Sequence, residues 1–113
     1  MPERDLATLR LPPRYLEMVR RILREHLPQA EVWAYGSRVN GDSYDASDLD
    51  LVVRNPDDLK RETARWWALT EAFEESDLPI QVQIVDWARI PASFHDEIEA
   101  AYVVVQHKLD AMT

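Results

Sequence analysis

At 113 residues the chain has the length of one domain, and we expect residues 1–113 to fold as a single unit. The absence of cysteine excludes a disulfide framework and a thiolate metal site, and it fits a reducing cytosol. Thirteen Lys and Arg against 21 Asp and Glu give a net charge of -8. This charge disfavours binding to long RNA or DNA, because such binding neutralises phosphates with basic side chains. No segment is apolar and long enough for a signal peptide or a membrane span, so we expect a cytoplasmic protein.

The N-terminal part of the chain predicts one amphipathic helix. Residues 1–11 carry no periodic pattern and are expected to form a loosely ordered lead-in. Pro12 and Pro13 suit a helix start, where a missing N–H costs little. Residues 14–27 then place apolar side chains at helical spacing, and Pro28 ends the helix.

The rest of the chain alternates strand-like and helix-like segments. Runs of β-prone residues predict strands at 31–35, 48–54 and 80–87. The second of these is apolar enough to be buried on both faces. Apolar residues three or four apart predict a helix over 57–75, and Pro91 opens another helix. Residues 103–105 (VVV) fit either the last turn of that helix or a short edge strand. The order of elements predicts a two-layer α/β fold, in which helices pack against a small sheet.

Both glycines of the chain fall within the stretch GSRVNGDSYDASDLD, between the first two predicted strands. This connection is too long for a hairpin turn and too short for a crossover helix, and such a loop in a compact domain is typical of a functional segment. Gly36 would let a phosphate approach the backbone, and Ser37 could add a hydrogen bond at the start of a short helical turn that Gly41 ends. Arg38 could pair with phosphate or with the nearby aspartates.

The same stretch ends on two carboxylates, Asp48 and Asp50. Two residues apart on a strand, they project from one face with their Cα atoms roughly 6.5–7 Å apart. Mg²⁺ binds through one or two carboxylates together with waters and substrate phosphates, so the pair suits a nucleoside triphosphate carried with Mg²⁺. A Gly-Ser alone is typical of an ordinary turn, and an Asp-x-Asp alone is typical of a solvated strand edge. Their combination at one end of neighbouring strands predicts a phosphoryl-transfer site.

Gly36-Ser37, ten residues, and then Asp48-Leu49-Asp50 together resemble the signature of the minimal nucleotidyltransferases, small members of the DNA polymerase β-like superfamily. The later segments LPIQVQIVDW and IPASFHDEIEAAYVVVQ resemble the antitoxin-type members that pair with HEPN-domain toxins. The resemblance extends from about residue 15 to residue 108. It implies a small mixed sheet flanked by helices, with Gly36 and Ser37 (and Arg38 beside them) at the nucleotide, and with Asp48 and Asp50 on Mg²⁺.

The activity that the resemblance implies is transfer of AMP from ATP to a hydroxyl. In the antitoxin branch the acceptor is a tyrosine of the partner HEPN-domain toxin, and the transfer silences the RNase activity of that toxin. ATP and a HEPN-domain toxin are therefore the implied partners. Both a homodimer and a hetero-oligomer are compatible with the sequence.

One position departs from the family pattern. The resemblance places a third carboxylate on the third predicted strand, where this chain carries Gln83. An amide is a neutral ligand and a poor general base, so Gln83 cannot do all that a carboxylate does there. Asp86 lies three residues further on and is expected to point to the opposite face, unless a bulge turns it toward the site.

Three functions follow from these observations. The first is an antitoxin that transfers AMP to its toxin. The second is a binding module that neutralises a toxin by docking alone, because Gln83 has weakened catalysis. The third is a transferase acting on a small molecule such as an aminoglycoside, for which a partner chain would have to supply the acceptor site.

Overall fold

The computed structural model describes residues 3–108. Its strands are β1 (Glu3–Arg4), β2 (Glu31–Tyr35), β3 (Leu49–Arg54), β4 (Val82–Asp86) and β5 (Tyr102–Gln106). Its helices are α1 (Pro13–His26), α2 (Ser37–Asn40), α3 (Trp66–Glu75) and α4 (Ala92–Ala100), with short 3-10 turns η1 (Leu6–Thr8) and η2 (Trp87–Arg89). No helix in this described range combines the length and the apolar character needed to cross a membrane.

The described strands form one mixed sheet in the order β1-β5-β2-β3-β4. Strand β2 lies at its centre and runs antiparallel to both β5 and β3. The outer pairs, β1 with β5 and β3 with β4, are parallel. The predicted small mixed sheet flanked by helices is therefore confirmed.

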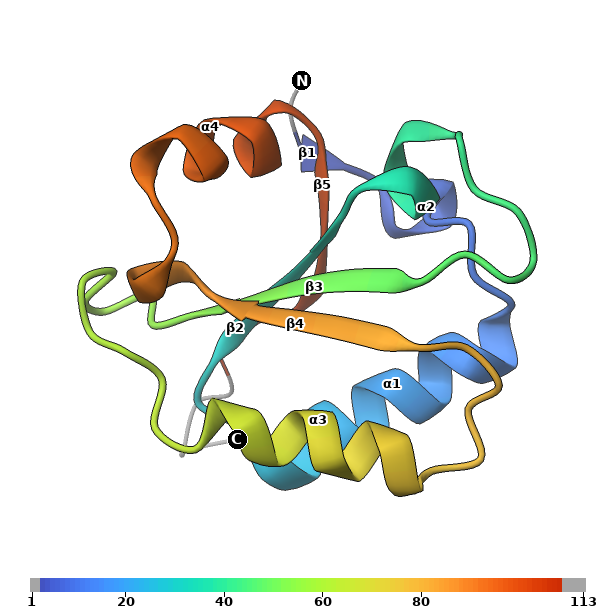
Figure 1. Ribbon diagram of the computed structural model, residues 1–113, viewed down its shortest axis with the longest axis horizontal. Helices are drawn as coiled ribbons and strands as arrows, with labels where there is room; N and C mark the ends of the chain where they lie inside the picture. Colours follow the sequence, from blue (N-terminus) through green and yellow to red (C-terminus); the bar gives the residue numbers. More distant parts are fainter. Residues whose placement is uncertain (1–2, 109–113) are drawn as a thin grey trace.

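Helices cover both faces of the sheet, with α1 and α3 on one side and α4 on the other (Figure 1). Strand β3 contributes to both layers because its apolar side chains alternate. Leu49, Leu51 and Val53 belong to the larger core, into which α1 and α3 pack. Val52 belongs to a smaller core with Ile98 of α4. The prediction that this strand is buried on both faces is confirmed.

The predicted helix over 57–75 is shorter in the structure, where α3 begins only at Trp66. Arg65, which precedes it, has a φ of 57°, a left-handed backbone conformation that a continuous helix cannot contain. The apolar spacing in residues 57–65 therefore did not signal a helix.

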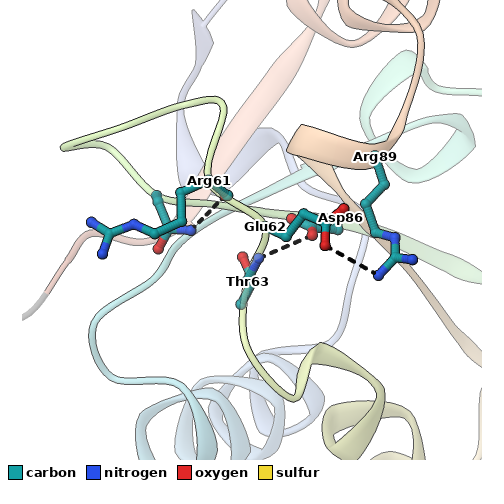
Figure 2. A network of polar contacts seen from close by, with 6 residues as sticks. Arg61, Glu62, Thr63, Asp86 and Arg89 are labelled. Atoms are coloured by element: carbon teal, nitrogen blue, oxygen red, sulfur yellow. Dashed lines mark hydrogen bonds and ion pairs between the residues drawn. The ribbon is translucent and has the colours of Figure 1, made fainter.

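Polar contacts hold the segment before α3 in its non-helical path (Figure 2). The carboxylate of Asp86 accepts the Thr63 N–H at 3.0 Å, which anchors the loop to the end of β4. A side-chain amide N–H of Asn55 donates to the Arg61 carbonyl at 2.8 Å. Asp86 lies 23 residues from Thr63, so the local pattern could not report this contact.

The two ends of the described chain are more ordered than the sequence suggested. Residues 103–105 lie in β5, which sits between β1 and β2, so they form neither a helical turn nor an edge strand. Glu3 and Arg4, expected in a loosely ordered lead-in, pair with β5, and Leu9 is buried in the larger core. Strand pairing between the start and the end of a chain leaves no local signal in sequence.

Candidate functional site

The backbone turns sharply where β2 ends, at Gly36. Its φ of 80° and ψ of -153° define a conformation that residues with a side chain rarely adopt. The Gly36 carbonyl then accepts N–H groups from Val39 at 3.0 Å and Asn40 at 2.9 Å, which starts the single turn of α2. Gly41, with a φ of 90°, ends it. The predicted helical turn between the two glycines is confirmed.

Gly36 also faces the second aspartate directly. A Cβ atom at position 36 would overlap Oδ2 of Asp50 and would lie 3.3 Å from its Cγ. Glycine is thus required twice here, by its backbone conformation and by the close approach of the carboxylate. In sequence, Gly36 predicts close approach of a phosphate to the backbone. Its contact with Asp50 depends on the fold and has no signal in the local sequence.

Asp48 and Asp50 are brought together at the start of β3. Asp50 is the second residue of the strand and half-buried, whereas Asp48 immediately precedes the strand and is exposed. Burial raises the pKa of the Asp50 carboxyl, and the negative charge of Asp48 raises it further. A buried carboxylate beside a like charge is costly, and a bound cation would remove that cost.

The position of the missing third carboxylate lies directly beside this pair. Strand β4 is parallel to β3 and its register places Gln83 next to Asp50. The register continues without a shift to Val53 and Asp86, so no bulge turns Asp86 toward the site. Asp86 lies instead on the opposite face, 2% exposed, as strand alternation predicted. Among residues 3–108, no group of three or more His, Cys, Asp or Glu side chains is placed to hold a metal ion.

Arg38 has partners other than the predicted phosphate or aspartates. Its side chain is only 4% exposed. The guanidinium donates to the Ser47 carbonyl from Nε at 3.1 Å and from Nη2 at 2.8 Å, and to the Asp45 carbonyl at 3.1 Å. A further bond reaches the Arg10 carbonyl at 2.5 Å. Arg38 therefore anchors the loop that leads to Asp48, which is a role that its sequence context did not indicate.

Tyr35 is a site residue that the sequence reasoning missed. It is the last residue of β2 and the direct cross-strand partner of Asp50. Burial, and in smaller part the charge of Asp50, raises the pKa of Tyr35 to about 12. In sequence it reads only as the end of a β-prone run, so the register between β2 and β3 was needed to find it.

Residues 16–108 match the nucleotidyltransferase domain family. The chain belongs to this family. It is 41% identical over 107 residues to the probable protein adenylyltransferase MntA of Haemophilus influenzae (strain ATCC 51907 / DSM 11121 / KW20 / Rd), covering 92% of this chain and 90% of that protein.

A solved structure supports the fold of this nucleotidyltransferase domain. A chain in a crystal structure of a toxin–antitoxin with AMP-PNP superposes with a TM-score of 0.64 at 18% identity. The match covers 80% of this chain and 71% of that one. The predicted polymerase β-like nucleotidyltransferase fold is confirmed by these matches.

We expect Arg38→Lys to destabilise the nucleotidyltransferase domain even without nucleotide. Lysine cannot reproduce the planar fork that serves three carbonyls, and the buried Ser47 carbonyl left without a donor would cost about 1–3 kcal/mol. Urea unfolding followed by tryptophan fluorescence would measure the loss. Arg14→Lys is the matched control, because Arg14 is exposed and should change the free energy of unfolding by less than about 0.5 kcal/mol. Unchanged stability together with weaker ATP binding would instead indicate that Arg38 binds the nucleotide.

We expect Asp50→Asn to stabilise the metal-free protein at neutral pH. Because the pKa of Asp50 is raised in the folded protein, its protonated carboxyl contributes to the free energy of unfolding. This contribution is fully present below the unfolded-state pKa and is lost as pH rises through the folded-state pKa. An uncharged amide avoids that loss, and a gain on the order of a few degrees in Tm is expected at low salt. The difference should vanish below about pH 4, where the carboxyl is protonated.

Thermal unfolding in the presence of a chelator, repeated across pH, would measure the effect. Asp96→Asn removes one charge from an exposed position on α4 and serves as the control for net charge. A lower Tm for Asp50→Asn than for this control at neutral pH would contradict the expectation.

Proposed function

We propose that this protein is a Mg²⁺-dependent nucleotidyltransferase that acts as an antitoxin, transferring AMP from ATP to a tyrosine hydroxyl of a partner HEPN-domain toxin. The observation that carries the proposal is the position of Asp48 and Asp50 at the start of β3, with Asp50 against the Gly36 turn. The similarity to a probable protein adenylyltransferase supports a protein acceptor. The resemblance of residues 78–106 to the antitoxin branch supports a toxin as that acceptor.

The donor set fits a magnesium ion. Carboxylate oxygens are the ligands that Mg²⁺ prefers, and one or two of them suffice when substrate phosphates complete the coordination. Asp48 and Asp50 would hold the ion, which when bound would neutralise charge on the phosphate oxygens. The raised pKa of Asp50 supports this role, because a site that is strained by like charge gains from a cation.

The remaining residues would position the nucleotide and keep the loop in place. Gly36 and Ser37 would bind the triphosphate, since glycine leaves the backbone accessible and the serine hydroxyl can donate to a phosphate oxygen. Arg38 would act indirectly, by holding Ser47 and thereby the approach to Asp48. In the transfer, the acceptor hydroxyl oxygen bonds to the α-phosphorus and its proton passes to solvent water, while the bond from that phosphorus to pyrophosphate breaks and pyrophosphate leaves.

The acidic surface supports a protein acceptor over a nucleic acid. A net charge of -8 repels a phosphate backbone. A partner protein that brings its own hydroxyl to the start of β3 carries no such backbone.

The proposal is tested by incubating the protein with Mg²⁺, ATP labelled at the α-phosphate, and a HEPN-domain toxin encoded beside it. We expect label on a tyrosine of the toxin, located by mass spectrometry. Asp48→Ala and Asp50→Ala should each reduce labelling at least about 100-fold, because an open metal site with one carboxylate holds Mg²⁺ poorly. Asp96→Ala removes an exposed carboxylate elsewhere and should label normally. Absence of label on the toxin, even with enzyme and toxin at equal concentrations, would contradict the proposal.

A second function is favoured by the position of Gln83. A neutral amide beside Asp50 can neither bind metal as strongly as a carboxylate nor accept a proton from the acceptor hydroxyl. The domain would then neutralise the toxin by binding alone. Toxin RNase assays with the Asp48→Ala, Asp50→Ala double variant separate the two functions, because a binding module would still inhibit.

We expect Gln83→Asp to raise the labelling rate by about tenfold or more, since a carboxylate at this position restores both a metal ligand and a base. Gln29→Asp is the matched control, because it adds the same charge at an exposed residue before the start of β2, away from the Tyr35 end of that strand, and should leave the rate unchanged. Equal rates for Gln83→Asp and the unsubstituted protein would mean that the site works without a third carboxylate.

A further inference from the structure

Three side chains form a row across the strands at the site. The antiparallel register pairs Tyr35 of β2 with Asp50 of β3, and the parallel register pairs Asp50 with Gln83 of β4. Side chains at directly paired positions share one face, with Cβ atoms about 4.5–5.5 Å apart. Asp50 is therefore flanked within the sheet by a phenol on one side and an amide on the other.

The Asp50 carboxylate is confined from two directions. Gly36 approaches it so closely that no Cβ atom could be accommodated between them. Tyr35 stands beside it on the neighbouring strand, half-buried. A carboxylate held in this way loses little rotamer freedom on binding a cation, because the fold has already restricted it.

Helix α4 holds Tyr35 in turn. The ring of Phe94 packs edge-on against the ring of Tyr35, with centroids 5.7 Å apart and planes at 83°. Such edge-to-face pairs are favourable beyond the area they bury. Both rings pack against the smaller core, whose buried members are Trp33, Val52, Trp87 and Ile98. That core thus supports Tyr35, the cross-strand partner of Asp50.

We propose that Tyr35 is a positioning residue for Asp50: its ring, held by Phe94, keeps the carboxylate against Gly36 in the orientation that binds a divalent cation. The inference rests on the proposed function, because it assumes a metal at Asp48 and Asp50. The phenol is neutral at physiological pH, so it adds no charge that would compete for the cation. The ring, and not the hydroxyl, is the part that acts.

Metal binding tests the inference without any catalytic step. Mn²⁺ is titrated into the protein in the absence of nucleotide and toxin, and free Mn²⁺ is measured by electron paramagnetic resonance. Tyr35→Ala should raise the Mn²⁺ Kd by about tenfold, the lower end of what loss of a supporting residue costs a metal site. Tyr35→Phe keeps the ring and its contact with Phe94, and should bind Mn²⁺ as the unsubstituted protein does.

Tyr102→Ala provides a matched control within the same core. Tyr102 stacks on Trp33 with ring centroids 3.9 Å apart, on β5, which is separated from β3 by β2. Its truncation should lower Tm, as truncation of Tyr35 does, and leave the Mn²⁺ Kd unchanged. Phe94→Leu should weaken Mn²⁺ binding in the same direction as Tyr35→Ala by a smaller factor, and it replaces Tyr35→Ala if that variant does not fold.

Several outcomes would overturn the inference. One is an unchanged Kd in Tyr35→Ala or, where that variant does not fold, in Phe94→Leu. Another is equal weakening in Tyr102→Ala, which would mean general loosening of the core. A Tyr35→Phe variant as weak as Tyr35→Ala would assign the effect to the hydroxyl. Failure of the proposed function has a different signature. If Asp48→Ala and Asp50→Ala bind Mn²⁺ as the unsubstituted protein does, these two residues form no metal site, and the inference is wrong as well.

Discussion

The contact between the Asp50 carboxylate and the Gly36 backbone is the constraint on which the site depends. It forces β2 to end at Tyr35, because only glycine can adopt the φ of 80° and leave room for the carboxylate. It also requires the pairing of Tyr35 with Asp50, since a shift of one residue would turn Asp50 to the other face. The Gly36 turn and the β2–β3 register together fix the positions of α2 and Asp48. The loop between them must span the distance that results.

The buried, positively charged side chain of Arg38 holds that loop. The guanidinium of Arg38 is the single charged group of this region with almost no exposure, and its hydrogen bonds go to backbone carbonyls. A planar fork with five donors can serve several carbonyls at once, which offsets much of the cost of burying the charge. Because Arg38 donates to the carbonyls of Ser47, Asp45 and Arg10, the loop that leads to Asp48 is tied to the segment before α1.

Local patterns carried most of the fold and the chemistry, and contacts between distant segments account for the rest. Spacing and breakers were enough for α1, β2 and β3, and alternation placed Asp48 with Asp50 and Asp86 opposite Gln83. The family resemblance, and not the alternation, put Gln83 beside the two aspartates. The helix predicted over 57–75 lacks its first part, residues 57–65, where Asp86, more than twenty residues away, accepts the Thr63 N–H. Strand β5, the anchoring role of Arg38 and the position of Tyr35 also arise from long-range pairing, which a window of sequence cannot contain.

The glutamine at position 83 can be understood as a balance between stability and metal affinity. Asp50 already carries a raised pKa from burial and from Asp48. A third carboxylate in the adjacent register position would add like-charge repulsion to the metal-free protein, and it would give more of that energy back on binding a cation. Gln83 removes the repulsion while keeping a polar group in the row, so the metal-free fold is less strained and a bound cation would be held less firmly. Under the proposed function, such a site would give up part of the preorganisation that catalysis needs. Toxin binding and AMP transfer would then be separable, and the charge at position 83 on β4 would set how strongly transfer is weakened.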